Sequence, residues 1–484
     1  MNKLSIMTLT IMTAMSMTLC SCWPKVNQAD VNTVIATPKT FSLSGSGAVP
    51  DKWWTVLGDA ELNKLIESAL RENLNLIATW DRLAEARATA RRSDAGLYPS
   101  LTGNGGASRT RTETHKGPGG FGAPLGTTYT SNFSLGLVAA YEVDLWGRVS
   151  SISEAAGLDV MASQEDLDAA AISLTAEVAQ TWFRLLEARQ QLSLLDSQIE
   201  TSKQILELVE LRFGLGKVPA IDLLQQKQQL ESKRAEKVRT DSARQVLVHQ
   251  LAVLLGKAPG KFTPAAGLLP KSLPELPDTG LSADLIRRRP DVRSAHYRVA
   301  AANKRVAAAI ADRFPRVSLS VQAGTATTRV RDLFDNWFAT LAANLAAPIL
   351  DGGARAAEVD RNKAVASRQL HGYAQKIVMA IKEVEDALVR ESQQRQYIDS
   401  LGKQLKLSDE VIAKTRQRYA NGDRAVDYLR ILASLESHQR LQRTVLQARR
   451  ELIDFRVALY RALAGNAARS ANVADDKNPQ EAQK

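Results

Sequence analysis

The sequence has few of the residues on which enzymes and disulfide-rich domains depend. Its 484 residues include only two cysteines, Cys20 and Cys22, and five histidines that are scattered without metal-ligand spacing. It contains no phosphate-binding loop and no nucleophile elbow. These absences argue against catalysis, a resident metal and a cofactor, and they leave no internal disulfide once a leader containing Cys20 is removed.

Neither positive nor negative charge is concentrated in a long segment of the chain. The formal net charge is +11, but Lys and Arg alternate with Glu and Asp along the chain, as at Arg184 and Glu187. Aromatic residues make up 5% of the sequence, and no basic stripe is interleaved with them, so we expect no nucleic-acid partner. The acidic group Glu383, Glu385 and Asp386 lacks an accompanying base or nucleophile. We interpret it as a solvated or lumen-facing helix surface.

Long apolar runs are scarce, and the clearest one lies at the N-terminus. Lys3 precedes an apolar stretch, Leu4 to Leu19, that is too short for a spanning helix but typical of a secretory signal. The stretch runs into Leu19-Cys20-Ser21-Cys22, which resembles the bacterial lipobox with Cys22 as the lipid-modified residue. We predict a lipoprotein signal peptide over 1–21; an ordinary signal peptide with incidental cysteines is the alternative.

Proline and glycine are missing from very long stretches. Both are absent from Leu158 to Phe213, and no proline occurs between Asp351 and Asn478. Apolar residues recur every seventh position there, and one copy maps onto the other without a gap. The repeats are Val178, Leu185, Leu192, Ile199, Leu206 and Phe213, and then Val384, Ile398, Leu405, Ile412 and Tyr419, interrupted only by Glu391. This spacing predicts a duplicated, left-handed coiled coil.

Between the helical stretches, apolar and polar residues alternate with the period of strands in an outer-membrane barrel. The alternation predicts strands over about 100–112, 129–143, 316–328 and 336–348. The stretches between them are predicted to form long helices over about 148–213, 220–255, 353–420 and 424–464. The predicted domains are an N-terminal lead to an equatorial region (22–58), a first repeat (59–256), a Pro-rich equatorial connector (257–280), a second repeat (281–465) and a polar disordered tail (466–484).

Four strands are too few to close a barrel, and an open sheet edge in lipid would leave backbone N–H and C=O groups without partners. The chain is therefore expected to pool its strands with copies of itself. A homotrimer would supply about twelve strands and a dimer only about eight. The predicted fold class is a mixed α+β membrane protein in which a long helical tunnel adjoins a shared transmembrane β-barrel.

Several motifs give the chain a family resemblance. They are Arg287-Arg288-Arg289-Pro290-Asp291-Val292-Arg293, Val143-Asp144-Leu145-Trp146-Gly147-Arg148, its counterpart Pro348-Ile349-Leu350-Asp351-Gly352-Gly353, and the paired turns Arg212-Phe213-Gly214-Leu215-Gly216 and Arg418-Tyr419-Ala420-Asn421-Gly422. With these motifs the chain resembles the TolC/OprM-type outer-membrane efflux factors, and most closely their NodT-type lipoprotein branch. The resemblance covers nearly all of the mature chain.

The resemblance implies a lipid-anchored homotrimer in the outer membrane of a Gram-negative bacterium. It would be the passive outer-membrane conduit of a tripartite system, with a periplasmic adaptor (membrane fusion) protein and an inner-membrane pump, expected to be of the RND type, as partners. Relatives export drugs, metals or signalling molecules, and the branch name refers to nodulation, so the resemblance does not choose a substrate. The rival hypothesis is a lipid-anchored periplasmic coiled-coil adaptor or scaffold without a membrane barrel.

The resemblance also places a gate at the periplasmic tip, where the paired helices turn. The tip turns contain Gly214, Gly216 and Gly422. The gate candidates are Asp423, Asp427, Leu429 and Tyr419, because carboxylates repeated by symmetry form rings that favour cations. Ordinary turn and cap residues are the alternative interpretation of the same positions.

Overall fold

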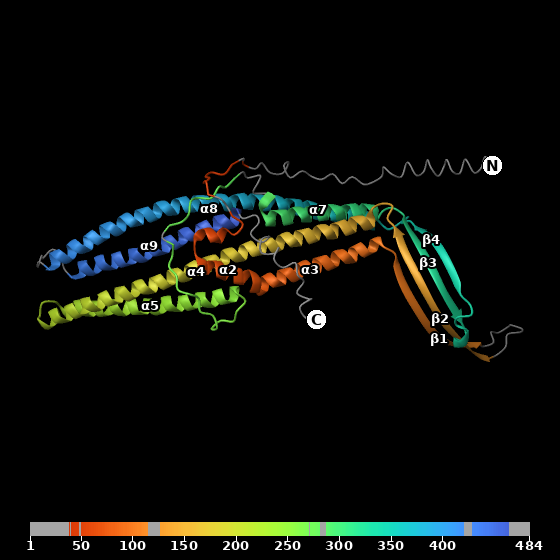
Figure 1. The fold of residues 1–484 in the computed structure, drawn as a ribbon, viewed down its shortest axis with the longest axis horizontal. Helices are drawn as coiled ribbons and strands as arrows, with labels where there is room; N and C mark the ends of the chain where they lie inside the picture. Colours follow the sequence, from red (N-terminus) through yellow and green to blue (C-terminus); the bar gives the residue numbers. More distant parts are fainter. Residues whose placement is uncertain are drawn as a thin grey trace. The chain divides into compact units, whose positions relative to one another are not determined.

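The computed structural model describes residues 38, 40–47, 50–114, 126–270, 272–280, 287–420 and 428–463, with the backbone alone at 114, 419 and 420. The elements are η3 (Trp53–Leu57), α2 (Ala60–Glu72), α3 (Leu74–Asp94), η4 (Ala95–Leu97), β1 (Ser100–Thr114), β2 (Gly126–Val143), α4 (Arg148–Gly214), α5 (Ala220–Leu254), α7 (Pro290–Ala311), β3 (Arg316–Thr327), η5 (Val330–Asp332), β4 (Phe338–Ala346), α8 (Ala354–Ala420) and α9 (Tyr428–Leu463) (Figure 1). The signal peptide, Cys22 and the tail 466–484 lie outside the described residues.

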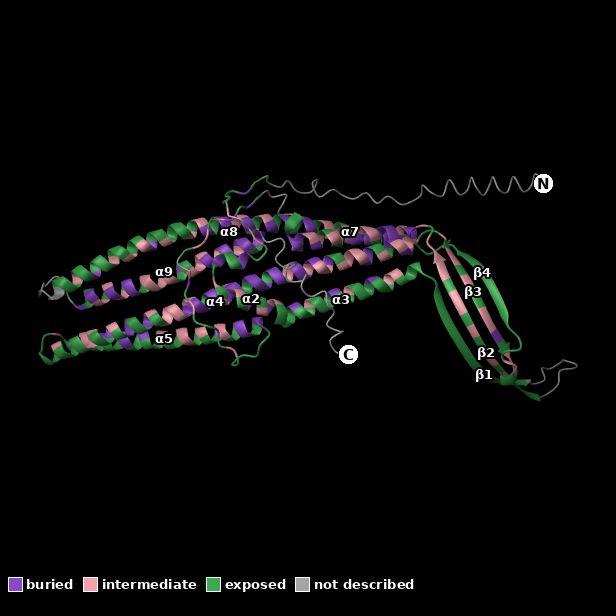
Figure 2. Ribbon diagram, in the orientation of Figure 1, coloured by how far each residue is buried: buried purple, intermediate pink, exposed green. Residues whose placement is uncertain are grey.

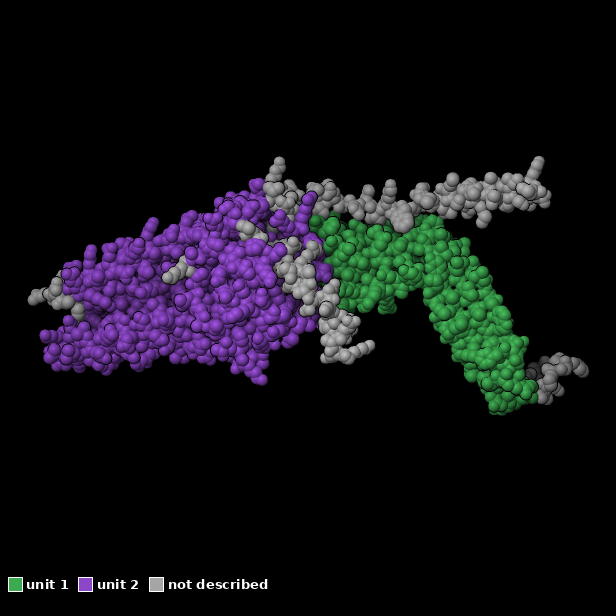
Figure 3. Space-filling model, viewed as in Figure 1, with its two compact units in different colours: residues 1–34, 83–163, 295–373 green, residues 35–82, 164–294, 374–484 purple. Residues whose placement is uncertain are grey.

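The order helix, strand, strand, long helix, returning helix occurs twice. Helices α4 and α8 each have 67 residues, which corresponds to about 100 Å of helix. The chain divides into two compact units, and each takes segments from both copies (Figure 3). One unit contains the four strands, and the other contains both helical turns and the connector. Over the described residues, none of the helices has the length and apolar character that crossing a membrane requires.

The first helical stretch is divided into α2 and α3. Asp59 caps α2, because its carboxylate accepts the backbone N–H groups of Glu61 and Leu62 at 2.9 and 3.0 Å. Asn73 then ends α2 and starts α3. Its side-chain oxygen accepts the N–H of Leu76 at 2.9 Å, and its amide donates to the carbonyl of Leu254 at 2.9 Å. Asn is a strong N-cap, so the local bond to Leu76 favours a helix start here, and the contact with the distant Leu254 holds the side chain that forms it.

The four strands form one antiparallel sheet in the order β1-β2-β3-β4. Because side chains alternate across a strand, the register assigns every residue to one of two faces. The mainly apolar face contains Leu101, Leu135, Leu137, Ala139, Tyr141, Val317, Leu319, Val321, Leu341, Ala343 and Leu345, and toward the end of β1 it also contains the charged residues Arg109, Arg111 and Glu113. The polar face contains Thr102, Ser108, Thr110, Asn132, Ser134, Ser318, Ser320, Gln322, Thr340 and Asn344.

The corners between strand and long helix explain two of the sequence motifs. Asp144 accepts the N–H groups of Val149 and Ser150 at 3.0 and 2.8 Å, which caps α4. Burial opposes its charge, but these hydrogen bonds outweigh burial and lower the pKa of Asp144. In the second copy Asp351 accepts the N–H groups of Gly353 and Arg355 at 3.0 and 3.3 Å. Both corners thus use an aspartate to satisfy the first helical N–H groups.

Of the heptad residues whose side chains the structure describes, all but Phe213 are buried or half-buried, and buried segments occur along the long helices (Figure 2). Val178 and Val384 are fully buried, whereas Phe213 is 42% exposed. On α8 and α9 the core contains Leu401, Val445 and Ala448, with Ile398, Leu405 and Leu441 packed against them. The seam therefore stabilises the long helices along most of their length but leaves an aromatic side chain accessible beside the first turn.

Candidate functional site

The structure describes only part of the predicted tip. Asp423, Asp427 and Gly422 lie outside the described residues, and Tyr419 is described by its backbone alone, in the last turn of α8. Leu429 lies in the first turn of α9 and is 46% exposed. These gate assignments remain predictions.

In the first copy, the tip turn ends α4 with a glycine in the left-handed conformation. Gly216 has φ +66°. The N–H of Lys217 donates to the carbonyl of Arg212 at 2.9 Å, and the N–H of Gly216 donates to the carbonyl of Phe213 at 2.9 Å. This pattern is a Schellman-type C-cap, for which glycine is preferred. Gly214, in contrast, is the last residue of α4 and does not require positive φ.

A buried hydrogen-bonded chain joins three helices close to the tip. The hydroxyl of Tyr428, in the first turn of α9, donates to the side-chain oxygen of Gln226 on α5. The amide of Gln226 donates to the carbonyl of Ser202 on α4 at 2.8 Å. Tyr428 is 5% exposed and Gln226 is 1% exposed. Gln226 therefore links the start of α9 to both helices of the first copy.

A second buried junction joins the same helices further along. The ammonium group of Lys233 on α5 donates to the side-chain oxygen of Gln439 on α9, and both residues are buried. Gln198 on α4 donates to the backbone carbonyl of Gln439 at 3.3 Å, and Arg443 donates to the side-chain oxygen of Gln198 at 2.8 Å. Burial, reinforced by the nearby charge of Arg443, lowers the pKa of Lys233.

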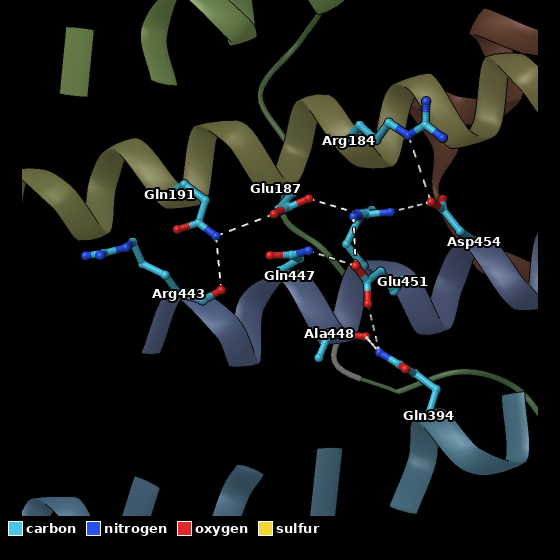
Figure 4. Close-up of polar contacts among 10 residues, drawn as sticks. Arg184, Glu187, Gln191, Gln394, Arg443, Gln447, Ala448, Glu451 and Asp454 are labelled. Carbon is cyan, nitrogen blue, oxygen red and sulfur yellow. Dashed lines mark hydrogen bonds and ion pairs between the residues drawn. The ribbon is translucent and has the colours of Figure 1, made fainter. Parts of the chain in front are cut away.

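Further polar contacts between α9 and the neighbouring helices lie along α9 (Figure 4). Arg450 donates to Glu187 on α4 at 2.8 Å and to Asp454 on its own helix at 2.5 Å. Burial opposes the charge of Arg450, but the two carboxylates raise its pKa. Gln191 of α4 donates to the carbonyl of Arg443 at 3.1 Å. Glu187, which the sequence shows as one of many alternating charges, thus joins α4 to α9.

A buried arginine holds one part of the Pro-rich connector. Arg456 of α9 is fully buried and donates to both carboxylate oxygens of Glu391 on α8, at 2.8 and 2.6 Å. Its remaining donor reaches the carbonyls of Pro274 and Glu275 at 2.9 Å each. Glu391 is the residue that interrupts the second heptad run. The interruption is therefore the carboxylate half of a buried ion pair.

The Arg-rich motif before α7 is anchored in the same unit. Arg289 donates to both carboxylate oxygens of Asp291, at 3.0 and 2.8 Å, and pairs with Glu383 at 2.8 Å. Glu385 accepts the backbone N–H of Ser42 at 2.9 Å. Two members of the acidic group thus bind other segments of the chain, which corrects the interpretation of that group as only a solvated or lumen-facing surface.

Sequence reasoning missed Tyr428, Gln226, Lys233 and Gln439 as functional candidates. They are separated by about two hundred residues along the chain, as shown by the 202 and 206 residues between the bonded partners. In the sequence, Gln226, Lys233 and Gln439 are polar residues within helices like many others, and the structure shows that these three are buried. Only the packed structure identifies which faces they occupy.

Comparison with known proteins identifies the family to which the chain belongs. The sequence profile of the outer membrane efflux protein family matches residues 65–257 and 281–465, one segment in each copy. The chain belongs to the outer membrane efflux protein family. The pyoverdine export outer membrane protein OpmQ of Pseudomonas aeruginosa is 30% identical over 421 residues, which cover 86% of this chain and 87% of OpmQ.

Two further members of the outer membrane efflux protein family extend the comparison. The cation efflux system protein CusC of Escherichia coli K12 is 29% identical over 471 residues, which cover 93% of this chain and 97% of CusC. The solved structure of the outer-membrane channel OprN is similar with a TM-score of 0.80 at 27% identity, covering 92% of this chain and 99% of OprN. The predicted mixed fold, with a helical tunnel and a small β domain, is confirmed.

As a member of this family, the chain is an outer-membrane channel component of a tripartite efflux or export system. Channels of the outer membrane efflux protein family form trimers, and the family consists of channel proteins rather than enzymes. The rival hypothesis of a periplasmic scaffold is therefore set aside.

Proposed function

We propose that three copies of the chain join their sheets into a twelve-stranded barrel that opens into the helical tunnel. The observation that carries this proposal is the sheet itself, which has one apolar and one polar face and is bounded by β1 and β4. In lipid an unpaired edge is costly, so each edge needs a partner strand. The apolar face then contacts lipid and the polar face lines the water-filled passage.

We propose that the passage is closed at its helical tip and opens when partners engage it. The contacts that support a movable tip are the hydrogen bonds from Tyr428 to Gln226 and from Gln226 to Ser202. Both bonds are neutral; the first joins α9 to α5 and the second joins α5 to α4, so breaking the bond between α9 and α5 costs about 0.5–1.5 kcal/mol. Asp423, Asp427, Leu429 and Tyr419 are the proposed narrowing residues, by resemblance to the family.

We further propose that Cys22 is acylated, so that 1–21 is a lipoprotein signal peptide, and that 466–484 is a disordered tail. The proposed partners are a periplasmic adaptor protein and an inner-membrane pump, with the RND type as the expected pump. Acyl chains on Cys22 would add a lipid anchor to the barrel. The lipobox-like Leu19-Cys20-Ser21-Cys22 supports this assignment.

The full-length chain, extracted from outer membranes in detergent, tests the proposed assembly. Native mass spectrometry is expected to give three copies, and planar bilayers are expected to show a channel of low conductance. Asp423→Ala combined with Asp427→Ala is expected to raise that conductance, because the carboxylate ring is removed. A monomer would overturn the proposed barrel, and unchanged conductance would remove both aspartates from the gate.

A further inference from the structure

Equivalent strand residues of the two internal repeats are separated by constant numbers of residues in the sequence. Pro99 and Pro315 precede β1 and β3, an offset of 216 residues, and Gly147 and Gly353 precede α4 and α8, an offset of 206 residues. The second offset is also the one that relates Val178 to Val384 in the heptads. Residues of β1 can therefore be matched with residues of β3, and residues of β2 with residues of β4.

Adding these offsets to the residue numbers of the first hairpin reproduces the strand register observed in the second hairpin. In the first hairpin Ser100 is opposite Ala140. The offsets convert that pair into Arg316 opposite Ala346, which is the pair observed in the second hairpin. The two hairpins therefore repeat one another residue for residue, although their loops differ in length. The internal repeat thus extends to strand register.

A single chain contains the pairings of β1 with β2, β2 with β3 and β3 with β4. The pairing that would continue the repeat, from β4 to the next β1, needs the β1 of a second chain. Within the chain, Gly136 of β2 is opposite Gly324 of β3. Applying the same offsets, we infer that β4 pairs antiparallel with β1 of a second copy so that Ala342 lies opposite Ser108 of that copy. This inference rests on the proposed trimeric barrel and specifies the register of the seam that closes it.

The strand lengths support this register. It places Phe338 opposite Thr112 and Ala346 opposite Asn104 of the second copy, so each of the nine residues of β4 meets a residue of β1. It also matches odd-numbered residues with odd-numbered ones, which keeps the apolar faces of the two sheets continuous. A slip of one residue would turn every β4 side chain to the wrong face.

The exposed side chains at the two edges support the same register. Leu341 and Leu345 of β4 are 77% and 71% exposed, and Leu101 of β1 is 70% exposed. The inferred register brings Leu345 opposite Gly105 of the second copy, which has no side chain to obstruct a leucine, and Ala343 opposite Ala107, whereas Leu341 falls opposite Arg109. The leucines of both edges thus stay on the face that the proposed barrel turns to lipid.

Cysteine pairs test the register on the full-length protein, with four positions on the polar face reused in every combination. The in-register pairs are Ala342→Cys with Ser108→Cys and Thr340→Cys with Thr110→Cys. The slipped controls are Thr340→Cys with Ser108→Cys and Ala342→Cys with Thr110→Cys. Directly opposite residues have Cβ atoms about 4.5–5.5 Å apart, and diagonal neighbours are about 7–8 Å apart, beyond disulfide reach.

In-register pairs are expected to form reducible intermolecular dimers and trimers about tenfold faster than the slipped pairs. Because successive pairs alternate between wide and narrow spacing, Ala343→Cys with Ala107→Cys samples the other spacing on the apolar face. Faster oxidation of either slipped pair would overturn the register while leaving the trimer intact. Absence of cross-links in every pair of a protein that is still trimeric would overturn the seam between β1 and β4. A monomer by native mass spectrometry would instead overturn the proposed barrel itself.

Discussion

Arg456→Met removes the guanidinium that holds α8, α9 and the connector together. The substitution leaves Glu391, whose side chain is 2% exposed, with only Arg395 as an ionic partner, at 2.9 Å. Loss of one member of a buried ion pair costs about 3–5 kcal/mol. Arg395 is about half exposed and offsets part of that cost, whereas the carbonyls of Pro274 and Glu275 lose two hydrogen bonds worth about 1 kcal/mol each. We expect a net loss of about 3–4 kcal/mol in the free energy of unfolding.

The matched control combines Arg456→Met with Glu391→Leu. The first copy has Leu185 at the position equivalent to Glu391, and Leu185 is fully buried, so the coiled coil accepts leucine there. We expect the double variant to recover to within about 2 kcal/mol of the parent, because no unpaired charge remains. Urea unfolding followed by far-UV circular dichroism gives the comparison, and proteolysis of the connector reports its release. A single variant that loses less than about 1 kcal/mol, or a double variant as unstable as the single, would refute this account.

Four other predictions concern separate parts of the molecule. Tyr428→Phe removes the hydroxyl that donates to Gln226, so single-channel conductance in planar bilayers should rise, and a current unchanged from the parent would exclude this bond from gating. Cys22→Ser should abolish metabolic palmitate labelling while leaving trimers intact; persistent labelling would contradict the lipidation assignment. Burial opposes the charge of Asp291, but Arg289 outweighs burial and lowers the pKa of Asp291. The ionised Asp291 therefore adds to the free energy of unfolding above the unfolded pKa of about 4, and this stabilisation is lost as the pH falls through the folded pKa. Asp291→Asn should therefore flatten the acid limb of the thermal stability profile, and an unaltered limb would argue against the pair. Gly256 has φ +69°, and a Cβ there would lie 2.1 Å from the carbonyl oxygen of Glu72, so Gly256→Ala should lower the melting temperature, whereas Gly214→Ala should not.

The sequence predicted the elements well because each of them depends on a local period. Seven-residue spacing gave the helices around Val178 and Val384, and two-residue alternation gave both faces of the sheet around Leu135 and Leu341. Asn73 was missed because asparagine is compatible with a helical stretch, and its role as a cap depends on a contact with the distant Leu254. Local pattern determined the type of each element, and distant contacts determined where one of them was divided.

The candidate site was less accessible to sequence reasoning, because its contacts join segments far apart in the chain. Glu391 was visible as an interruption of the heptads, but nothing local indicated Arg456, 65 residues away, as its partner. Glu383 was visible as part of an acidic group, but its pairing with Arg289 requires α8 to pack against the segment before α7. Charged residues on a helix have the same sequence pattern whether they face water or a buried partner.

The equal length of α4 and α8 restricts how the chain can evolve. Adding one residue to α4 alone would move everything beyond it by about 1.5 Å and rotate it by about 100°, whereas α8 would be unaffected. The turn at Gly216 would then be out of phase with its counterpart, and polar residues such as Gln198 would leave their partners on α9. Tolerated changes of length are therefore expected to come in compensating sets, one in each half of the duplicated chain.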